Sequence, residues 1–173
     1  DDQRWVLGHQ PVLDAETVAR IRDLGLVLTT HTNRHIYKDG DLWVQRRGPQ
    51  GQDDIVPLRR LLDANVPVAF GSDNLPVSLF GPIWHAVARL SRNGTQVAPA
   101  QALSRQEALR IATRGGAYLT FDEDVRGAIA PGKLADLMVV NADPLTCEEN
   151  DIASLHSLLT IVDGRIIAHP SCK

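Results

Sequence analysis

Short apolar runs alternate with helical patterns along the first two thirds of the chain. Three of the apolar runs are typical of buried strands, and they span residues 5–7, 26–30 and 66–70. Four segments place apolar side chains three or four positions apart, as amphipathic helices do, and they span residues 14–24, 54–65, 82–92 and 104–112. This rhythm predicts parallel strands joined by right-handed crossovers. Three strands are too few to close a barrel, so we expect them to be part of one.

Particular residues indicate where elements begin and end in this region. Ser104 and Glu107 form a capping-box pattern, which predicts the start of a helix. Gly115 and Gly116 predict its end, because glycine favours the backbone conformation that follows a helix. The segment 32–53 carries glycines and charges without a clear period, so we expect a functional loop there.

The pattern changes after about residue 121. Short apolar runs separated by turn residues such as Pro131-Gly132 and Asp163-Gly164 predict strands within residues 125–129, 135–140 and 159–167. We therefore divide the chain into an α/β part, residues 1–121, and a small β-rich part, residues 122–173.

Composition and charge narrow the classes of partner. The 173 residues carry a formal net charge of −3 and a pI near 6.1, which gives no sign of a nucleic-acid or anionic-membrane partner. No apolar run approaches the roughly 20 residues that a membrane span needs. Cys147 and Cys172 are too few for a disulfide framework, so we expect a reducing compartment, the cytoplasm.

Polar residues follow the ends of all three predicted strands: His9, His31 and Asp73. Parallel strands end at one edge, and in (β/α) barrels that edge carries the chemistry. Asp73 is of a type that ligates a divalent metal and accepts a proton from water, although Gly71-Ser72-Asp73-Asn74 suits a simple turn equally well. An imidazole such as His9 binds Zn²⁺ through one ring nitrogen, or it serves as a hydrogen-bonded residue at the start of a loop.

The segment after the second predicted strand offers groups for a substrate. His31 and His35 are four apart, but a helical metal-binding pair is poorly supported where a strand ends. His31, Asn33 and Arg34 supply hydrogen-bond donors for a polar or anionic group, and we expect them to bind substrate. The alternative is a polar loop that makes its own turns.

Two motifs resemble the amidohydrolase superfamily: residues 71–76, Gly-Ser-Asp-Asn-Leu-Pro, and residues 127–137, which contain Pro131-Gly132-Lys133. Residues 104–120, 141–145 and 160–165 continue the similarity. The residue pattern of these motifs is most similar to that of the amidohydrolase-3 branch, which includes proteins similar to N-substituted formamide deformylase. That branch usually has Glu before and Ala after the histidine matched by His9, and this chain has Gly8 and Gln10 there.

The resemblance implies an α/β fold, namely the C-terminal portion of a (β/α)8 barrel followed by a small β-rich domain. It implies that Asp73 binds metal and moves protons, that His9 is a metal ligand, and that residues 32–37 form a substrate-side loop. It also implies one or two divalent ions, with Zn²⁺ favoured.

Parts of the superfamily pattern have no match in this chain. None of the six histidines forms the His-x-His pair with which the family barrel begins, and the first five strands have no counterpart. We therefore expect this polypeptide to be a fragment whose partner is the N-terminal remainder of the same protein. A homo-oligomer is left open.

The expected activity is metal-dependent hydrolysis of a C–N bond, of the amide type, in a small molecule. A deaminase or cyclic amidase of the same superfamily fits the sequence as well, because fold does not determine substrate. A hypothesis of a different kind is that the chain is a non-catalytic α/β module, in which the histidines and Asp73 only form the hydrogen bonds of turns.

Overall fold

Two small sheets and a set of short helices make up the protein in the computed structural model, which describes residues 3–73 and 77–168. Strands β1 (Val6–Gly8), β2 (Val27–Thr30) and β3 (Val68–Phe70) form a parallel sheet in the order β1-β2-β3. Val6 pairs with Val27, and Leu28 with Val68. The predicted parallel sheet is therefore confirmed, and its central strand is almost completely buried.

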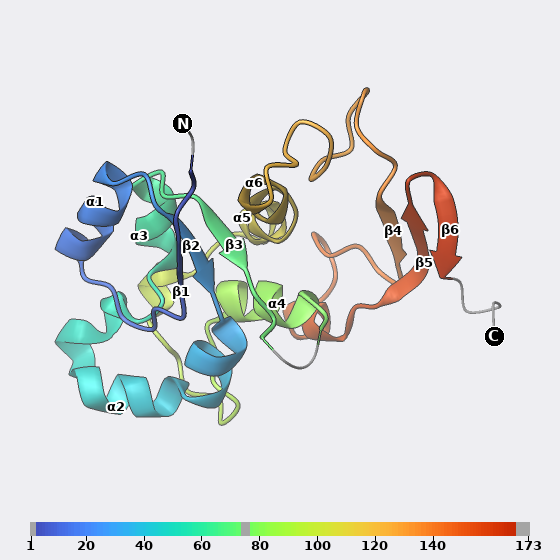
Figure 1. Cartoon of the computed structure of the whole chain (residues 1–173). Coiled ribbons are helices and arrows are strands. Elements are labelled where there is room, and N and C mark those ends of the chain that lie inside the picture. Colours follow the sequence, from blue (N-terminus) through green and yellow to red (C-terminus); the bar gives the residue numbers. More distant parts are fainter. Residues whose placement is uncertain (1–2, 74–76, 169–173) are drawn as a thin grey trace.

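Two crossover helices connect these strands. In α1 (Ala15–Asp23), the Asp14 carboxylate accepts a hydrogen bond from the backbone N–H of Thr17 at 2.7 Å and caps the first turn. The second crossover helix, α3 (Leu58–Asp63), is shorter than the pattern predicts because Pro57 stands at its N-cap. Figure 1 shows α1 and α3 together on one side of the sheet.

The segment 32–53 is helical, so the loop predicted there is wrong. The π-helix η1 (Asn33–Lys38) follows β2 and leads into α2 (Gly40–Gly51) and η2 (Gln52–Asp54). Glycine obscured the helical period, because Gly48 has φ 65° and kinks α2 just before Pro49. The apolar side chains that hold this segment to the core lie on both helices: Ile36, Trp43 and Val44.

A buried arginine fastens the helix that follows β3, α4 (Phe80–Ala88). Arg89 is fully buried and donates hydrogen bonds to the backbone oxygens of Val97, Val56 and Ile55 at 2.8, 3.0 and 2.7 Å. Burial lowers the pKa of Arg89 to about 9, so its guanidinium remains protonated at neutral pH. The short helix η3 (Pro99–Gln101) comes next in the chain.

The next helix begins where the sequence predicts and ends later. Ser104 and Glu107 form the capping box of α5 (Arg105–Arg110). The helix then runs without a break through η4 (Ile111–Gly115) and α6 (Gly116–Leu119), so the predicted stop at Gly115 and Gly116 is wrong. Gly115 serves packing instead, because a Cβ there would lie 2.2 Å from the backbone oxygen of Val68 in β3.

The tail contains an antiparallel sheet of three strands, β4 (Leu137–Val140), β5 (Ser157–Val162) and β6 (Arg165–Ala168), in the order β4-β5-β6. The strand predicted at 125–129 is wrong, because these residues turn against the end of α6. A Cβ on Gly127 would lie 2.8 Å from the Cβ of Ala117. Short helix η5 (Glu149–Ser154) returns to pack on α4, as Figure 1 shows.

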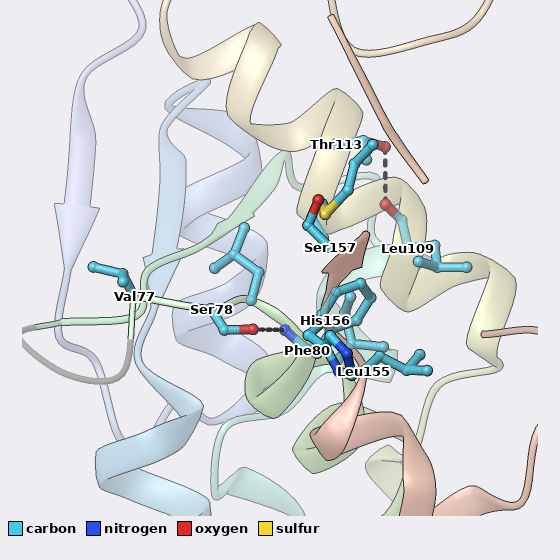
Figure 2. Close-up of a pocket in the computed structure, with 12 residues that line it drawn as sticks. Val77, Ser78, Phe80, Leu109, Thr113, Leu155, His156 and Ser157 are labelled. Atoms are coloured by element: carbon cyan, nitrogen blue, oxygen red, sulfur yellow. Dashed lines mark hydrogen bonds between the residues drawn. The ribbon is translucent and has the colours of Figure 1, made fainter. Parts of the chain in front are cut away.

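A cavity of about 520 Å³ separates the tail from the helices of the α/β part, and Figure 2 shows its lining. Most of its side chains are apolar, among them Phe80, Leu109 and Met138. Its hydroxyl groups bond locally, since Thr113 donates to the backbone oxygen of Leu109 and Ser78 accepts from the N–H of Phe80. The cavity therefore lacks the convergent polar groups of a catalytic site. Over the described ranges, the structure has no helix with the length and apolarity to span a bilayer.

Candidate active site at the carboxyl ends of the parallel strands

The three strands of the parallel sheet bring His9, His31 and Asp73 to one edge. His9 follows β1, His31 follows β2, and Asp73 lies three residues beyond β3. The imidazole rings of His9 and His31 stack with their centroids 3.8 Å apart and their planes 9° from parallel. Gly71 makes room for them, because a Cβ there would lie 2.7 Å from Cε1 of His31.

Both candidate metal ligands have left-handed backbone. His9 has φ 58° and Asp73 has φ 59°. Few residues other than glycine adopt this region, although Asp and His do so more readily than most, and the conformation costs about 1 kcal/mol or more. His9 and Asp73 are two of nine non-glycine residues with positive φ in the described part of the chain, so the strain is compatible with a functional site but does not by itself identify one.

Of the predicted substrate-binding residues, Asn33 is built into this edge and Arg34 is exposed. Asn33 is 7% exposed and donates a hydrogen bond from Nδ2 to the backbone oxygen of Ser72 at 3.0 Å, which joins η1 to the segment carrying Asp73. Arg34 forms an ion pair from Nε to Oδ2 of Asp39 at 2.5 Å. The roles of His31, Asn33 and Arg34 in binding substrate stay predictions.

Two histidines at this edge hold buried ring nitrogens without partners among the described residues: Nδ1 of His31 and both nitrogens of His35. Burial lowers the pKa of each imidazole, and the charges of neighbouring histidines lower it further. Buried polar atoms without partners are rare in folded proteins. Among the described residues nothing satisfies these three nitrogens, so they are open to a ligand.

His85, on α4, is a buried residue that the sequence does not single out for function. Its Nδ1 lies 3.3 Å from Oγ1 of Thr32, and its ring stacks on Tyr37 with the centroids 5.0 Å apart. Burial lowers the pKa of His85 to about 4, so its imidazole is neutral at pH 7. Its place in an apolar helical pattern gives no signal of the contact with η1.

The donor types at this edge suit a divalent metal, because imidazole and carboxylate are the ligands that zinc takes in hydrolases. The residues that the structure describes hold no group of three or more His, Cys, Asp and Glu side chains placed to bind an ion. His9 and Asp73 therefore offer part of a ligand set. Residues 74–76 of the first motif, His169 and Cys172 lie outside the described residues.

Comparison with known proteins places these features in a family. The amidohydrolase family matches residues 1–168. The chain is 32% identical over 162 residues to N-substituted formamide deformylase of Arthrobacter pascens, covering 91% of this chain and 30% of that protein. It is thus about a third of the length of this relative.

Solved structures show the same fold. An uncharacterised metal-dependent hydrolase from Pyrococcus horikoshii superimposes with a TM-score of 0.72 at 22% identity, over 86% of this chain and 31% of the other. Atrazine chlorohydrolase TrzN from Arthrobacter aurescens, solved with zinc, superimposes with a TM-score of 0.64 at 22% identity, over 95% and 36%. The prediction of an α/β fold that forms part of a barrel, followed by a small β-rich segment, is confirmed. The chain belongs to the amidohydrolase family, in its amidohydrolase-3 branch.

Proposed function

We propose that the protein carrying this chain hydrolyses a C–N bond, of the amide type, in a small molecule, and that it uses a divalent metal, zinc in the first instance. The observation that carries the proposal is the convergence of His9, His31 and Asp73 at the carboxyl edge of a parallel sheet. Membership of the amidohydrolase family supports the reaction class, and the A. pascens relative is named for the deformylation of N-substituted formamides.

Asp73 and His9 take different parts in this reaction. In this proposal His9 and Asp73 would hold the metal, which when bound would supply Lewis acidity toward a carbonyl group and lower the pKa of water. Asp73 accepts a proton from the attacking water and delivers it to the leaving nitrogen. Neutral His31, stacked on His9, and the Asn33 amide orient the substrate beside them, and Arg34 contacts a polar group farther out.

The rest of the ligand set comes, in this proposal, from the N-terminal remainder of the same protein. The chain covers 30% of the A. pascens deformylase, and its three parallel strands form only part of a barrel. A parallel sheet with open edges gains stability when further strands pair with it. The two cysteines favour a reducing compartment, and we place the protein in the cytoplasm.

Replacement of Asp73 tests the proposal. In the complete zinc-loaded protein, Asp73→Asn should lower kcat for amide hydrolysis by roughly 10²-fold or more, because the amide cannot accept the proton. Asp23→Asn, on the exposed end of α1, is the matched control and should retain full activity. Zinc content is measured alongside by elemental analysis. Full turnover by Asp73→Asn at metal saturation would contradict the role of Asp73, and a complete protein that binds no zinc would favour a non-catalytic module.

A further inference from the structure

Asp73 is an exposed residue on a short segment that leaves the parallel sheet. The backbone N–H of Gly71 donates to the oxygen of Thr30 at 2.9 Å, so the pairing with β2 extends one residue beyond β3. Asp73 itself has φ 59°, a left-handed conformation that persists only where surrounding contacts hold it. Because Asp73 is exposed, the direction of its side chain depends on the backbone that carries it.

The side-chain amide of Asn33 holds this segment. Its Nδ2 donates a hydrogen bond to the backbone oxygen of Ser72 at 3.0 Å, and Asn33 is 7% exposed. A carbonyl oxygen only accepts hydrogen bonds, so the contact requires that Nδ2, and not Oδ1, faces Ser72. The Ser72 oxygen belongs to the rigid peptide plane that ends at the nitrogen of Asp73, and φ of Asp73 is the rotation about the next bond. The hydrogen bond therefore fixes the plane against which Asp73 turns.

Close packing does not orient this amide. Asn33 borders a cavity of about 350 Å³ between η1, α4 and η5, whose lining also includes Tyr37, His85 and Asn150. On α4, Gly81 leaves room beside the amide, because a Cβ there would lie 3.5 Å from Oδ1 of Asn33. Since open space borders Asn33 on this side, the hydrogen bond to Ser72 determines how the amide lies.

A second contact supports the same segment. The ring of His31 lies against Gly71, where a Cβ would be 2.7 Å from Cε1, and it also stacks on His9. His31 and Asn33 stand at the junction of β2 and the π-helix η1, and π-helical turns occur frequently at functional sites. The two candidate metal ligands, His9 and Asp73, are thus joined to the same short stretch of chain.

We propose that Asn33 is a positioning residue for Asp73: its amide fixes the Ser72–Asp73 peptide and so holds the carboxylate in place to share a metal with His9. The inference rests on the proposed function, which makes Asp73 a metal ligand. It gives Asn33 a role that does not depend on contact with the substrate. Replacing a residue that orients a metal ligand typically lowers metal affinity or activity by roughly 10- to 100-fold.

Two substitutions of Asn33 test the proposal in the complete zinc-loaded protein, with N-butylformamide as the amide. Asn33→Leu keeps the shape of the side chain without its donor, and Asn33→Ala removes the amide altogether. Both should lower kcat by about tenfold or more and weaken zinc binding by a similar factor, with KM changed less than about twofold. Zinc affinity is measured by competition with a chelator.

Gln96→Met is the matched control for loss of an amide hydrogen bond. Nε2 of Gln96 donates to the backbone oxygen of Ala88 at 2.9 Å, at the C-terminal end of α4, so this variant removes a similar bond elsewhere. It should retain the kcat, KM and zinc affinity of the wild type. A rise in KM at unchanged kcat in the Asn33 variants, or equal losses in Gln96→Met, overturns the inference. A loss in Asn33→Leu that Asn33→Ala does not share overturns it as well, because both lack the amide.

Crystal structures separate failure of this inference from failure of the proposed function. If the complete protein binds no zinc and hydrolyses no amide, the proposed function fails, and the backbone at Asp73 decides the inference. The metal-free wild type should show Asp73 with φ near 59°, and Asn33→Leu should show a reoriented Ser72–Asp73 peptide. The same peptide orientation in both structures contradicts the inference, as does a wild type without the bond from Asn33 to Ser72.

Discussion

The two sheets of this protein differ in how far the chain itself covers them. In the parallel sheet, Val27 and Leu28 of the central strand are each 1% exposed, and the strand lies between β1 and β3 with α1 and α3 on one side of the sheet (Figure 1). In the antiparallel sheet of the tail, Met138 is 53% exposed and Ile166 is 64% exposed. The strands of both sheets are mostly apolar in sequence, so the difference in exposure lies in what packs against them.

The chain itself buries the parallel sheet, whereas it leaves apolar side chains of the antiparallel sheet exposed. Three of the four residues of β2 are buried, as is usual for a central strand of a parallel sheet. The tail carries exposed apolar side chains. Those on β4, β5 and β6 are Met138, Val139, Leu158, Val162, Ile166 and Ile167. Exposed apolar surface of this kind marks an interaction site. Under the proposed function, the N-terminal remainder covers it.

The largest predicted effect on stability comes from a substitution in the hydrophobic core of the α/β part. Leu58→Ala should lower the free energy of unfolding by about 2–5 kcal/mol, because Leu58 is fully buried and its loss leaves a cavity. Ile166→Thr, in the tail, should cost about 0.5 kcal/mol or less while the site stays exposed. Urea unfolding followed by circular dichroism measures both. If Ile166→Thr costs 2 kcal/mol or more in the complete protein, the tail sheet is covered there.

A pair of adjacent glycines gives the next effect and tests the packing of the helix against β3. Gly115→Ala should destabilise the protein by about 1–3 kcal/mol, since the new Cβ meets backbone of Val68 that cannot move aside easily. Gly116→Ala meets nothing within 4 Å and should stabilise the helix by up to about 1 kcal/mol. Thermal unfolding of both variants checks the sign of each change. Equal effects would show that helix propensity, and not contact with β3, decides this position.

Local signals in the sequence were sufficient to predict the parallel sheet and the sheet edge at which the candidate site residues lie. The strands that precede His9, His31 and Asp73 were evident as apolar runs, and parallel pairing then required the three residues to meet at one edge. The capping box at Ser104 was equally readable, because both of its hydrogen bonds join residues three apart in sequence. The catalytic and binding roles of the site residues, and the domain division at residue 121, stay predictions.

Features that depend on distant contacts could not be predicted. Gly115 resembles the end of a helix in sequence. Its actual role is to allow close packing against Val68, which lies 47 positions away in the chain. Segment 32–53 looked like a loop because glycines interrupt its period, whereas its helices are held by the core. The pocket beside Asn33 joins three segments, and no local pattern brings Tyr37, His85 and Asn150 together.

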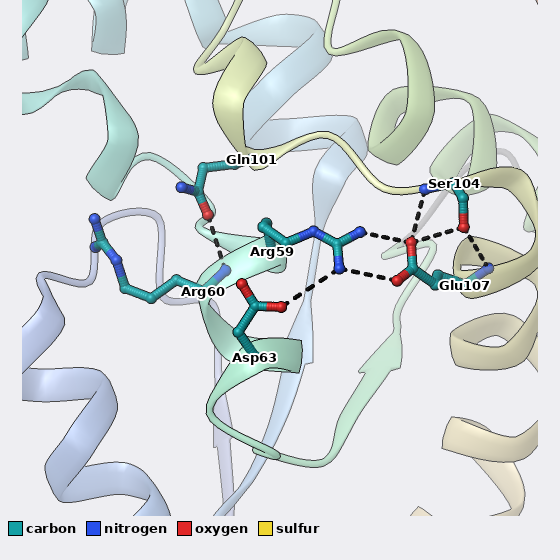
Figure 3. A network of polar contacts seen from close by, with 6 residues as sticks. All are labelled: Arg59, Arg60, Asp63, Gln101, Ser104 and Glu107. Carbon is teal, nitrogen blue, oxygen red and sulfur yellow. Dashed lines mark hydrogen bonds and ion pairs between the residues drawn. The ribbon is translucent and has the colours of Figure 1, made fainter.

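The smallest predicted effect concerns an ion pair that joins α3 to α5, shown in Figure 3. Arg59 pairs with Glu107 at 2.5 Å between Nη2 and Oε2, and together with Ser104 it lowers the pKa of Glu107 from 4.5 to about 2. Because the pKa is lower in the folded state, this stabilisation is complete above about pH 4.5 and is lost as the pH falls toward 2. Both side chains are about a third exposed, so we expect about 1 kcal/mol.

Double-mutant analysis isolates this pair from other acidic groups. Glu123, paired with Arg4, titrates in the same direction, so the pH dependence of the wild type alone cannot identify Glu107. Glu107→Gln and Arg59→Met should each flatten the decline in stability between pH 4.5 and 2, and the double variant should add little to either. Urea unfolding at several pH values measures the coupling. Additive effects of the two substitutions would mean that the ion pair between α3 and α5 contributes nothing to the stability of the α/β part.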